Sequence, residues 1–97
     1  MTDEARVDPY AKLRELLEAQ GFPHEFTHKF VGDNSAEFQA AVQAMEASIP
    51  GLQLQSRRES SGGQHVAYTY ILRVNAAEEV VFLYEATRRL AGIRIIL

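Results

Sequence analysis

The sequence predicts an α+β fold from three observations. Residues 65–74 form the longest strand-like run, in which apolar and polar side chains alternate with the period of two that gives a strand one buried face. Three shorter runs alternate in a similar way. Two runs with helical spacing separate them, so the order is β-α-β-β-α-β after one leading helix. The right-handed crossover rule leaves few topologies, and the simplest is a ferredoxin-like sandwich with an antiparallel sheet in the order 4-1-3-2 and two helices on one face.

The composition is that of one small globular domain. The chain has 97 residues, of which 46% are apolar and 24% charged, and its net charge is −3. It contains no cysteine, which excludes thiol catalysis, disulfides and cysteine-ligated metals. The slight acidity gives no reason to expect DNA binding. No apolar run reaches the ~18–20 residues of a membrane span, and the acidic start lacks the pattern of a signal peptide, so we expect a cytoplasmic protein.

Three segments are predicted along the chain. Residues 1–7 are polar and are predicted to be a disordered N-terminus. Residues 8–21 are predicted to form an N-terminal helix, with Asp8 as the N-cap, Pro9 at the first helical position and a glycine at the end. Residues 22–97 form the single ferredoxin-like domain.

The first half of that domain contains a strand and a helix. Residues 25–32 alternate, with two phenylalanines and His28 on one side. After a turn, either Asn34 or Ser35 is predicted to cap the helix. The apolar stripe of this helix consists of Phe38, Ala41, Val42, Met45 and Ile49.

The second half contains a hairpin, a helix and a last strand. Residues 52–59 alternate but are more polar, as expected of an edge strand, and the Ser60–Gly63 turn leads into the long strand. Asn75, with Glu78 three residues on, is predicted to cap the next helix. The last strand spans 93–97. The buried stripe predicted for the helix consists of Val80, Leu83, Tyr84, Thr87 and Leu90, widened by Val81 and Phe82.

The long strand decides which face of the sheet is buried. One set of alternate residues is more apolar, so we expect it to face the helices and the other set to face outward. The inward side chains are Val66, Tyr68, Tyr70, Leu72 and Val74, and the outward side chains are Ala67, Thr69, Ile71 and Arg73.

Several short motifs share the order and spacing of one known family. Phe22-Pro23 precedes an aromatic residue and a lysine that stands shortly before a glycine. The Ser60–Gly63 turn follows, and Leu83-Tyr84-Glu85 leads through a spacer to the strand at 93–97. In these features residues 22–97 resemble the YbeD-like family of small uncharacterised proteins. The resemblance implies a ferredoxin-like fold comparable to ACT-type regulatory domains, and it implies no catalytic residue.

No motif in the sequence indicates an enzyme or a metal site. His24 and His28 are four residues apart, but they lie on an extended segment, so the three histidines, His24, His28 and His65, lack the helical i,i+4 arrangement of a zinc site. No Gly-x-Ser-x-Gly motif or serine–histidine–acid grouping occurs. Acylphosphatases share this topology but carry an arginine in the loop after the first strand, where this chain has Asp33. We therefore predict a non-enzymatic protein without cofactor or metal, in which His28 is a partly buried core residue.

RNA binding is the alternative that the topology leaves open. RRM domains share the topology and present aromatic residues on the open face of the internal strands. Tyr68 and Tyr70 lie on the appropriate strand, but they belong to its apolar set. If that set is buried, the tyrosines cannot stack on bases, and no RRM signature is present.

Cations concentrate on the predicted strands, and this pattern indicates a binding surface. These cations occupy the alternate positions that are predicted to face outward, so they lie on the open face of the sheet among apolar side chains. Such a surface suits a protein partner or a small anionic ligand. The alternative is an ordinary solvated face whose charges prevent edge pairing. Because ACT-type domains commonly associate, the resemblance also suggests that this chain forms a homodimer. The candidate binding residues are Lys29, Arg57, Ile71, Arg73 and Arg94, with Thr27, Val31, Thr69 and Ile96 among them.

Overall fold

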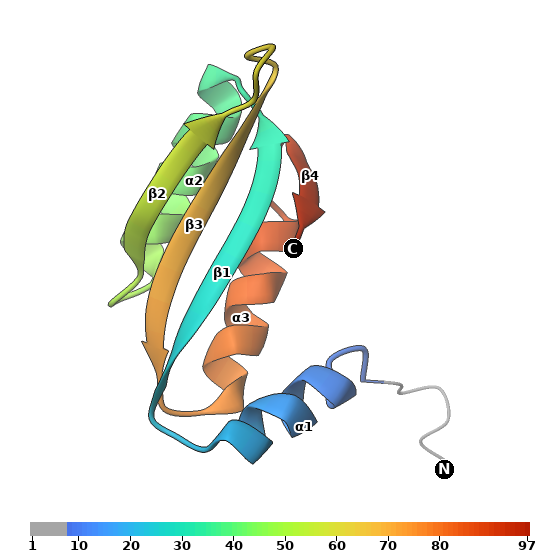
Figure 1. The fold of residues 1–97 in the computed structure, drawn as a ribbon, viewed down its shortest axis with the longest axis vertical. Coiled ribbons are helices and arrows are strands. Elements are labelled where there is room, and N and C mark those ends of the chain that lie inside the picture. Colours follow the sequence, from blue (N-terminus) through green and yellow to red (C-terminus); the bar gives the residue numbers. More distant parts are fainter. Residues whose placement is uncertain (1–7) are drawn as a thin grey trace.

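The computed structural model describes residues 8–97 and confirms the predicted order of elements (Figure 1). The N-terminal segment 1–7, predicted to be disordered, lies outside the described residues. The elements are α1 (Ala11–Gln20), β1 (His24–Asp33), α2 (Ala36–Ser48), β2 (Gln53–Glu59), β3 (His65–Val74), α3 (Ala77–Arg88) and β4 (Ile93–Ile96).

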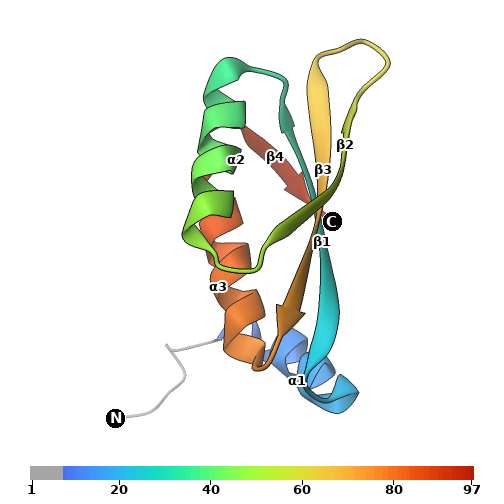
Figure 2. The same cartoon turned by 90° about the vertical axis from the view of Figure 1, so that its left-hand side faces the viewer.

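The four strands form one antiparallel sheet in the order β2-β3-β1-β4, as predicted. β1 pairs with β3 along its whole length, from the His24–Val74 pair to the Asp33–His65 pair. β4 pairs only with the last part of β1. Figure 2 shows α2 and α3 on one side of the sheet, so the other side is open. The fold is therefore the predicted ferredoxin-like sandwich.

The predicted inward side of β3 is buried. Tyr70 is 1% exposed, and its ring stacks on Phe30 of β1 with a centroid distance of 6.0 Å. Tyr68 stacks on the same phenylalanine at 5.6 Å. The Tyr70 hydroxyl donates a 2.8 Å hydrogen bond to Glu46 of α2, and burial together with this contact raises the pKa of Tyr70 above its usual value. These aromatic contacts join the two central strands to the helix layer.

His28 belongs to the core, in agreement with the structural role predicted for it. Its side chain is 1% exposed and packs beside Phe26, Phe30 and Tyr84. Its Nε2 lies 2.9 Å from the hydroxyl oxygen of Thr87 on α3. Because burial penalises the charged imidazolium, the pKa of His28 falls from 6.5 to about 4.

The helix starts differ from the predicted ones in two of three cases. α2 begins after Ser35, whose hydroxyl accepts a 3.1 Å hydrogen bond from the Phe38 N–H, so the serine alternative is confirmed. α1 begins only at Ala11: residues 9 and 10 form a turn in which the Ala11 N–H donates to the Asp8 carbonyl and the Tyr10 N–H donates to the Asp8 carboxylate.

The predicted capping box of α3 is wrong. The N-cap is Ala76, which makes no side-chain cap hydrogen bond, and the N–H of Asn75 donates to Glu79 at 3.1 Å. Glu78 instead forms an ion pair with Arg14 of α1. The tertiary contact between the two helices therefore replaces the local cap that the sequence suggests.

α1 packs against α3 beneath the sheet (Figure 1). Leu17 is buried in the main core, and the Tyr10 hydroxyl donates to the Glu85 carboxylate. This hydrogen bond and the nearby arginines hold the pKa of Glu85 below its usual value. The acidic side chains of α3 thus anchor the leading helix.

β1 and α2 approach each other most closely at Gly32. A Cβ atom added to Gly32 would lie closer than 3.0 Å to the buried ring of Phe38. Gly32→Ala should therefore lower the free energy of unfolding by about 1–3 kcal/mol, the usual cost of overpacking a core. Urea unfolding measures this change. Gly62→Ala is the control, since its Cβ would meet nothing within 4 Å, and an equal loss in both variants would contradict the close contact.

The buried His28 makes stability depend on pH. Unfolded His28 binds a proton near pH 6.5, whereas folded His28 does so only near pH 4, so between these values the unfolded state holds more protons. This contribution is complete above about pH 6.5 and is lost as the pH falls to about 4, for a total of about 3 kcal/mol. Urea unfolding across this range should give a flatter profile for His28→Phe than for wild type. Parallel profiles would show that His28 is not the titrating group.

Candidate functional site

The open face of the sheet is the surface that the sequence points to as a binding site. Its side chains come from alternate positions of each strand, and the cross-strand register sets their neighbours. Glu25 lies opposite Arg73, and Lys29 lies opposite Thr69. From the bottom of the sheet upward, the rows are Glu25–Arg73, Thr27–Ile71–Gln53, Lys29–Thr69–Ser56 and Val31–Ala67–Arg58.

The structure places three of the five predicted site residues on this face. Lys29 and Arg73 are exposed, and Ile71 is half-buried between its neighbours on β1 and β2. Thr27, Val31 and Thr69 share the face, as expected from their parity.

Arg57 does not lie on the open face, because β2 contains a bulge. Leu54 pairs with Tyr70 and Ser56 with Thr69, which leaves Gln55 as the extra residue. Beyond the bulge the alternation is reversed, so Arg57 pairs with Tyr68 and faces the helix side. Its Nε donates to the Tyr68 hydroxyl at 3.2 Å, and its guanidinium lies 5.7 Å from the centre of that ring.

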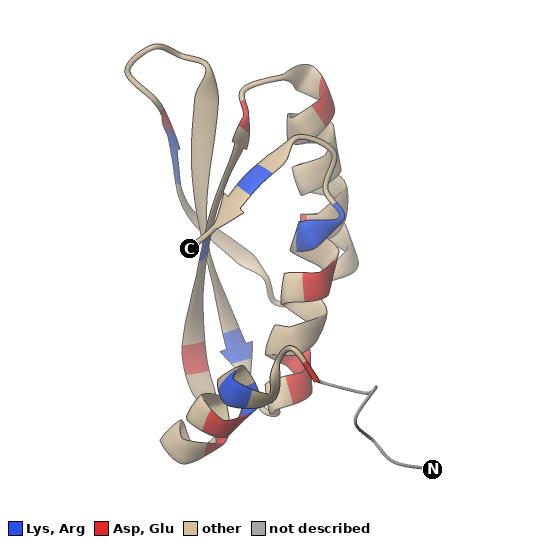
Figure 3. Cartoon of the chain, turned by 90° about the vertical axis from the view of Figure 1, so that its right-hand side faces the viewer, with Lys and Arg blue, Asp and Glu red and all other residues tan. Residues whose placement is uncertain are grey.

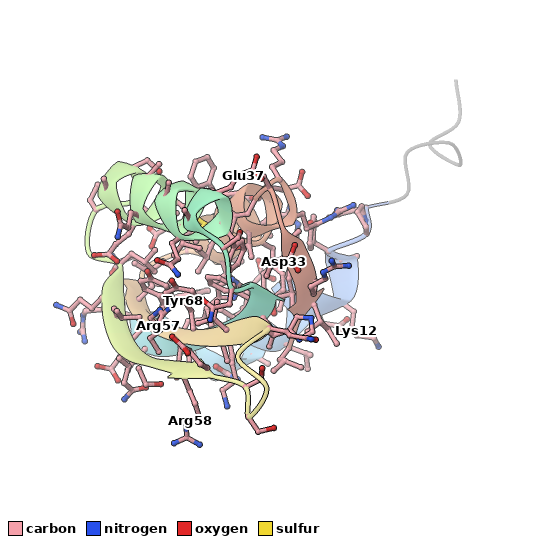
Figure 4. The ribbon with its side chains drawn as sticks, turned by 90° about the horizontal axis from the view of Figure 1, so that it is seen from above. Lys12, Asp33, Glu37, Arg57, Arg58 and Tyr68 are labelled. Atoms are coloured by element: carbon pink, nitrogen blue, oxygen red, sulfur yellow. The ribbon has the colours of Figure 1, made fainter. Side chains whose placement is uncertain are left out.

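Arg58 takes the outward position that was predicted for Arg57. In Figure 4 Arg57 and Tyr68 lie together on the inner side of the sheet, while Arg58 extends away from the helices. The outward position of Arg58 could not be predicted from the sequence, because the run Gln53–Ser56 contains only one apolar side chain. Nothing in it reveals a change of parity.

A second irregularity changes the outward side of β4. Phe30 pairs with Ile96 and Val31 with Ile95, and the register then shifts so that Gly32 pairs with Ile93. The prediction that Ile96 lies on the open face is therefore wrong: it packs against the core with its partner Phe30. Ile95 takes the outward position instead and is 51% exposed.

Arg94 stands apart from the cations of the open face. Its Nε donates a 2.7 Å hydrogen bond to the Asp33 carboxylate, and this contact raises the pKa of the guanidinium. Its charge is thus compensated at the end of β1, and its role as a binding residue stays a prediction.

The open face carries an excess of uncompensated positive charge. Lys29, Arg58 and Arg73 form no ion pair with another residue of the described part of the chain, 8–97. Glu25 lies opposite Arg73 in the register. Figure 3 shows the contrast with the helices, where most acidic positions lie. One surface of the protein is therefore cationic, although the net charge of the whole chain is −3.

The described residues, 8–97, contain no metal-binding cluster and no helix that could span a membrane. Within 8–97 no group of three or more histidine and carboxylate side chains is placed to hold a metal ion. None of the helices in this range has the length and apolar character needed to span a bilayer. Tyr68 and Tyr70, the residues on which RNA stacking would depend, are buried against Phe30.

Comparisons with known proteins agree with the resemblance seen in the sequence. A family model described as a protein of unknown function (DUF493) matches residues 18–97. A UPF0250 protein from Shewanella piezotolerans is 33% identical over 87 residues, which cover 89% of this chain and 96% of the relative. No solved structure matched the chain. These findings support the similarity to a family of small uncharacterised proteins, and neither match names an activity.

Proposed function

Since the chain belongs to the DUF493 family of proteins of unknown function, we propose its role from its own geometry: a non-enzymatic interaction domain that binds an acidic protein surface on its open sheet face. The observation that carries the proposal is the set of unpaired cations Lys29, Arg58 and Arg73 around exposed or half-buried apolar side chains. Regulation through such binding is the ACT-like role that the fold suggests.

The spacing of the cations supports a protein partner over a small anion. Arg58 lies at the level of Ala67 and Arg73 six residues further along β3. At the ~3.3 Å rise of a strand these levels are about 20 Å apart. One small anion cannot contact side chains spread over that length, whereas an extended or folded acidic surface can. Apolar contacts with Val31, Ile71 and Ile95 would add to the charge attraction.

An acidic peptide probe tests this proposal. A labelled extended peptide of alternating glutamate and valine should bind the wild-type protein, and NMR shifts should map to the open face, including Thr27, Ala67 and Ile71. The triple variant Lys29→Gln, Arg58→Gln, Arg73→Gln should bind about tenfold or more weakly while its thermal unfolding is unchanged. Fluorescence anisotropy measures the affinity.

A charge-matched variant separates the site from the total charge. Lys12→Gln, Arg88→Gln, Arg89→Gln removes three exposed cations from the helical side and should leave binding unchanged. Equal weakening in both triple variants would reject the open face as the site. Competition by millimolar inorganic phosphate would favour a small anion instead. Tighter, salt-sensitive binding of mixed-sequence RNA would overturn the protein assignment.

We propose that the homodimer suggested by the sequence forms at the free edge of β4. The open face itself would bring like charges together in a symmetric contact, which opposes self-association there. The outer edge of β2 is protected by its bulge and by Arg57 and Arg58. The β4 edge is mainly isoleucine, and the charge of Arg94 is compensated by Asp33. Its chemistry therefore permits antiparallel pairing with a second copy.

Sedimentation measures this association directly. Wild-type protein at tens of micromolar should sediment as a dimer, and Ile95→Glu should sediment as a monomer because it places a carboxylate at the paired edge. Leu54→Glu is the matched control on the opposite edge strand, where Leu54 is 46% exposed. The proposed contact at β4 would be contradicted if the wild type stayed monomeric at all concentrations or if Ile95→Glu still formed dimers.

A further inference from the structure

Phe82 is exposed where the sequence predicts a buried side chain. It lies on α3 between Val81 and Leu83, both of which are buried, yet Phe82 itself is 61% exposed. The prediction that it widens the buried stripe is therefore wrong. The ring contributes little to the core, because the stabilisation depends on the apolar area removed from water.

Phe82 lines a groove of about 890 Å³. One wall is the flank of α3, and the other is the end of α2 with Ile49 and Pro50. Leu72 and Arg73 of β3 also line the groove. The groove therefore lies where the last part of β3 meets the helix layer.

This last part of β3 has no strand partner on the side of β2. β2 begins at Gln53, which pairs with Ile71, whereas β3 continues to Val74 and is still paired with β1 there. Figure 1 shows β3 extending downward beyond the start of β2. Within residues 8–97 no backbone hydrogen bond from a loop reaches residues 72–74 either. A short length of unpaired strand edge therefore lies beside the groove.

The backbone of Arg73 points toward the vacant position on this edge. The His65 carbonyl accepts the Ser60 N–H at 2.9 Å, so His65 directs its backbone groups toward the side of β2. These directions alternate along a strand, and β3 pairs with β1 without a bulge, so Arg73 directs its backbone groups to the same side as His65. The N–H and C=O of Arg73 are therefore available to an added strand.

Arg73 is also a groove residue whose charge has no partner. It forms no ion pair with another residue of the described range 8–97, and its side chain belongs to the open face. The carboxylates that line the groove already have partners, which are Arg14 for Glu78, Arg88 and Arg89 for Glu85, and the Asn75 N–H for Glu79. The charge left to attract an occupant is therefore positive.

An added antiparallel strand would place its side chains in a fixed way. The residue opposite Arg73 would exchange both backbone hydrogen bonds with it and direct its side chain to the open face, beside the guanidinium. The two neighbours of that residue would point to the groove, toward Leu72 and Phe82. An acidic residue between two apolar ones fits these positions. A second copy of this chain fits less well, because symmetric pairing would set two Arg73 side chains opposite each other.

We propose that an extended segment of the partner, with an acidic residue between two apolar ones, adds to the free edge of β3 at Arg73 and fills the groove beside Phe82. This inference rests on the function proposed above, since the acidic partner is the same, and it adds the mode of binding. The backbone of Arg73 holds the segment, and the apolar groove selects its side chains. The rest of the partner lies over Lys29 and Arg58 on the open face.

N-methylated forms of the glutamate–valine peptide test this mode of binding. Successive N–H groups of an extended peptide point to opposite edges, so methylation of the glutamate nitrogens blocks the edge that pairs with Arg73, whereas methylation of the valine nitrogens blocks the other edge. The glutamate-methylated peptide should bind about tenfold or more weakly than the unmethylated one, and the valine-methylated peptide should bind equally well. Fluorescence anisotropy measures the three affinities.

Two measurements on the protein locate the segment. With the unmethylated peptide bound, the Arg73 amide should exchange its hydrogen about tenfold or more slowly in NMR, because it gains a hydrogen bond. Phe82→Ser should weaken peptide binding about tenfold with little change in thermal stability, because the ring is already exposed. Leu16→Ser removes a similarly exposed side chain, 56% exposed on α1, and should leave binding unchanged.

The outcomes distinguish the mode of binding from the partner itself. If the open-face triple variant weakens binding but both methylated peptides bind like the unmethylated one, the proposed function stands and the edge assignment is overturned. Unchanged exchange of the Arg73 amide, or binding that is insensitive to Phe82→Ser, would also overturn the edge assignment. Slow exchange in the free protein that is lost on dilution would assign the edge to a second copy instead. If the unmethylated peptide does not bind at millimolar concentration, the proposed function fails, and this inference fails with it.

Discussion

The full-length pairing of β1 with β3 is the constraint on which the rest of the structure depends. It brings Phe30 onto both Tyr68 and Tyr70 and places His28 between the sheet and α3. A shift of one residue in this pairing would place Lys29 or Val31 opposite Tyr68, so that either the tyrosines would turn toward water or the outward side chains of β1 would turn toward the helices. The large aromatic area buried on one side therefore determines which side chains are free on the other.

This division gives the domain two surfaces of different character. The open face combines cations with half-buried apolar residues on a flat sheet. The helix side carries the acids, several of which anchor α1 and line the groove beside Phe82.

The sequence was sufficient to predict the sandwich fold and the residues at the centre of its open face. Lys29, Ile71 and Arg73 lie as predicted, because they belong to the two long strands whose apolar residues mark the inward side at every second position. Arg57 and Ile96 were assigned to the wrong side, since a bulge inserts one residue and reverses the alternation beyond it. The polar run before Arg57 gives no hydrophobic signal of this change. Phe82 could not be placed either, because its burial depends on how far α2 extends over α3.

What the sequence determined by itself are the properties set by local periodicity. The order of elements and the buried face of β3 follow from alternating and helical patterns that each segment carries within itself, and the crossover rule then selects the sheet order. Tertiary structure decided the properties that need two segments at once. The register across β2 and β4, the ion pairs of Arg94 and Glu78, and the groove that exposes Phe82 all depend on how elements meet in space. No single stretch of sequence determines these tertiary contacts, because their energy comes from interactions between residues far apart in the chain.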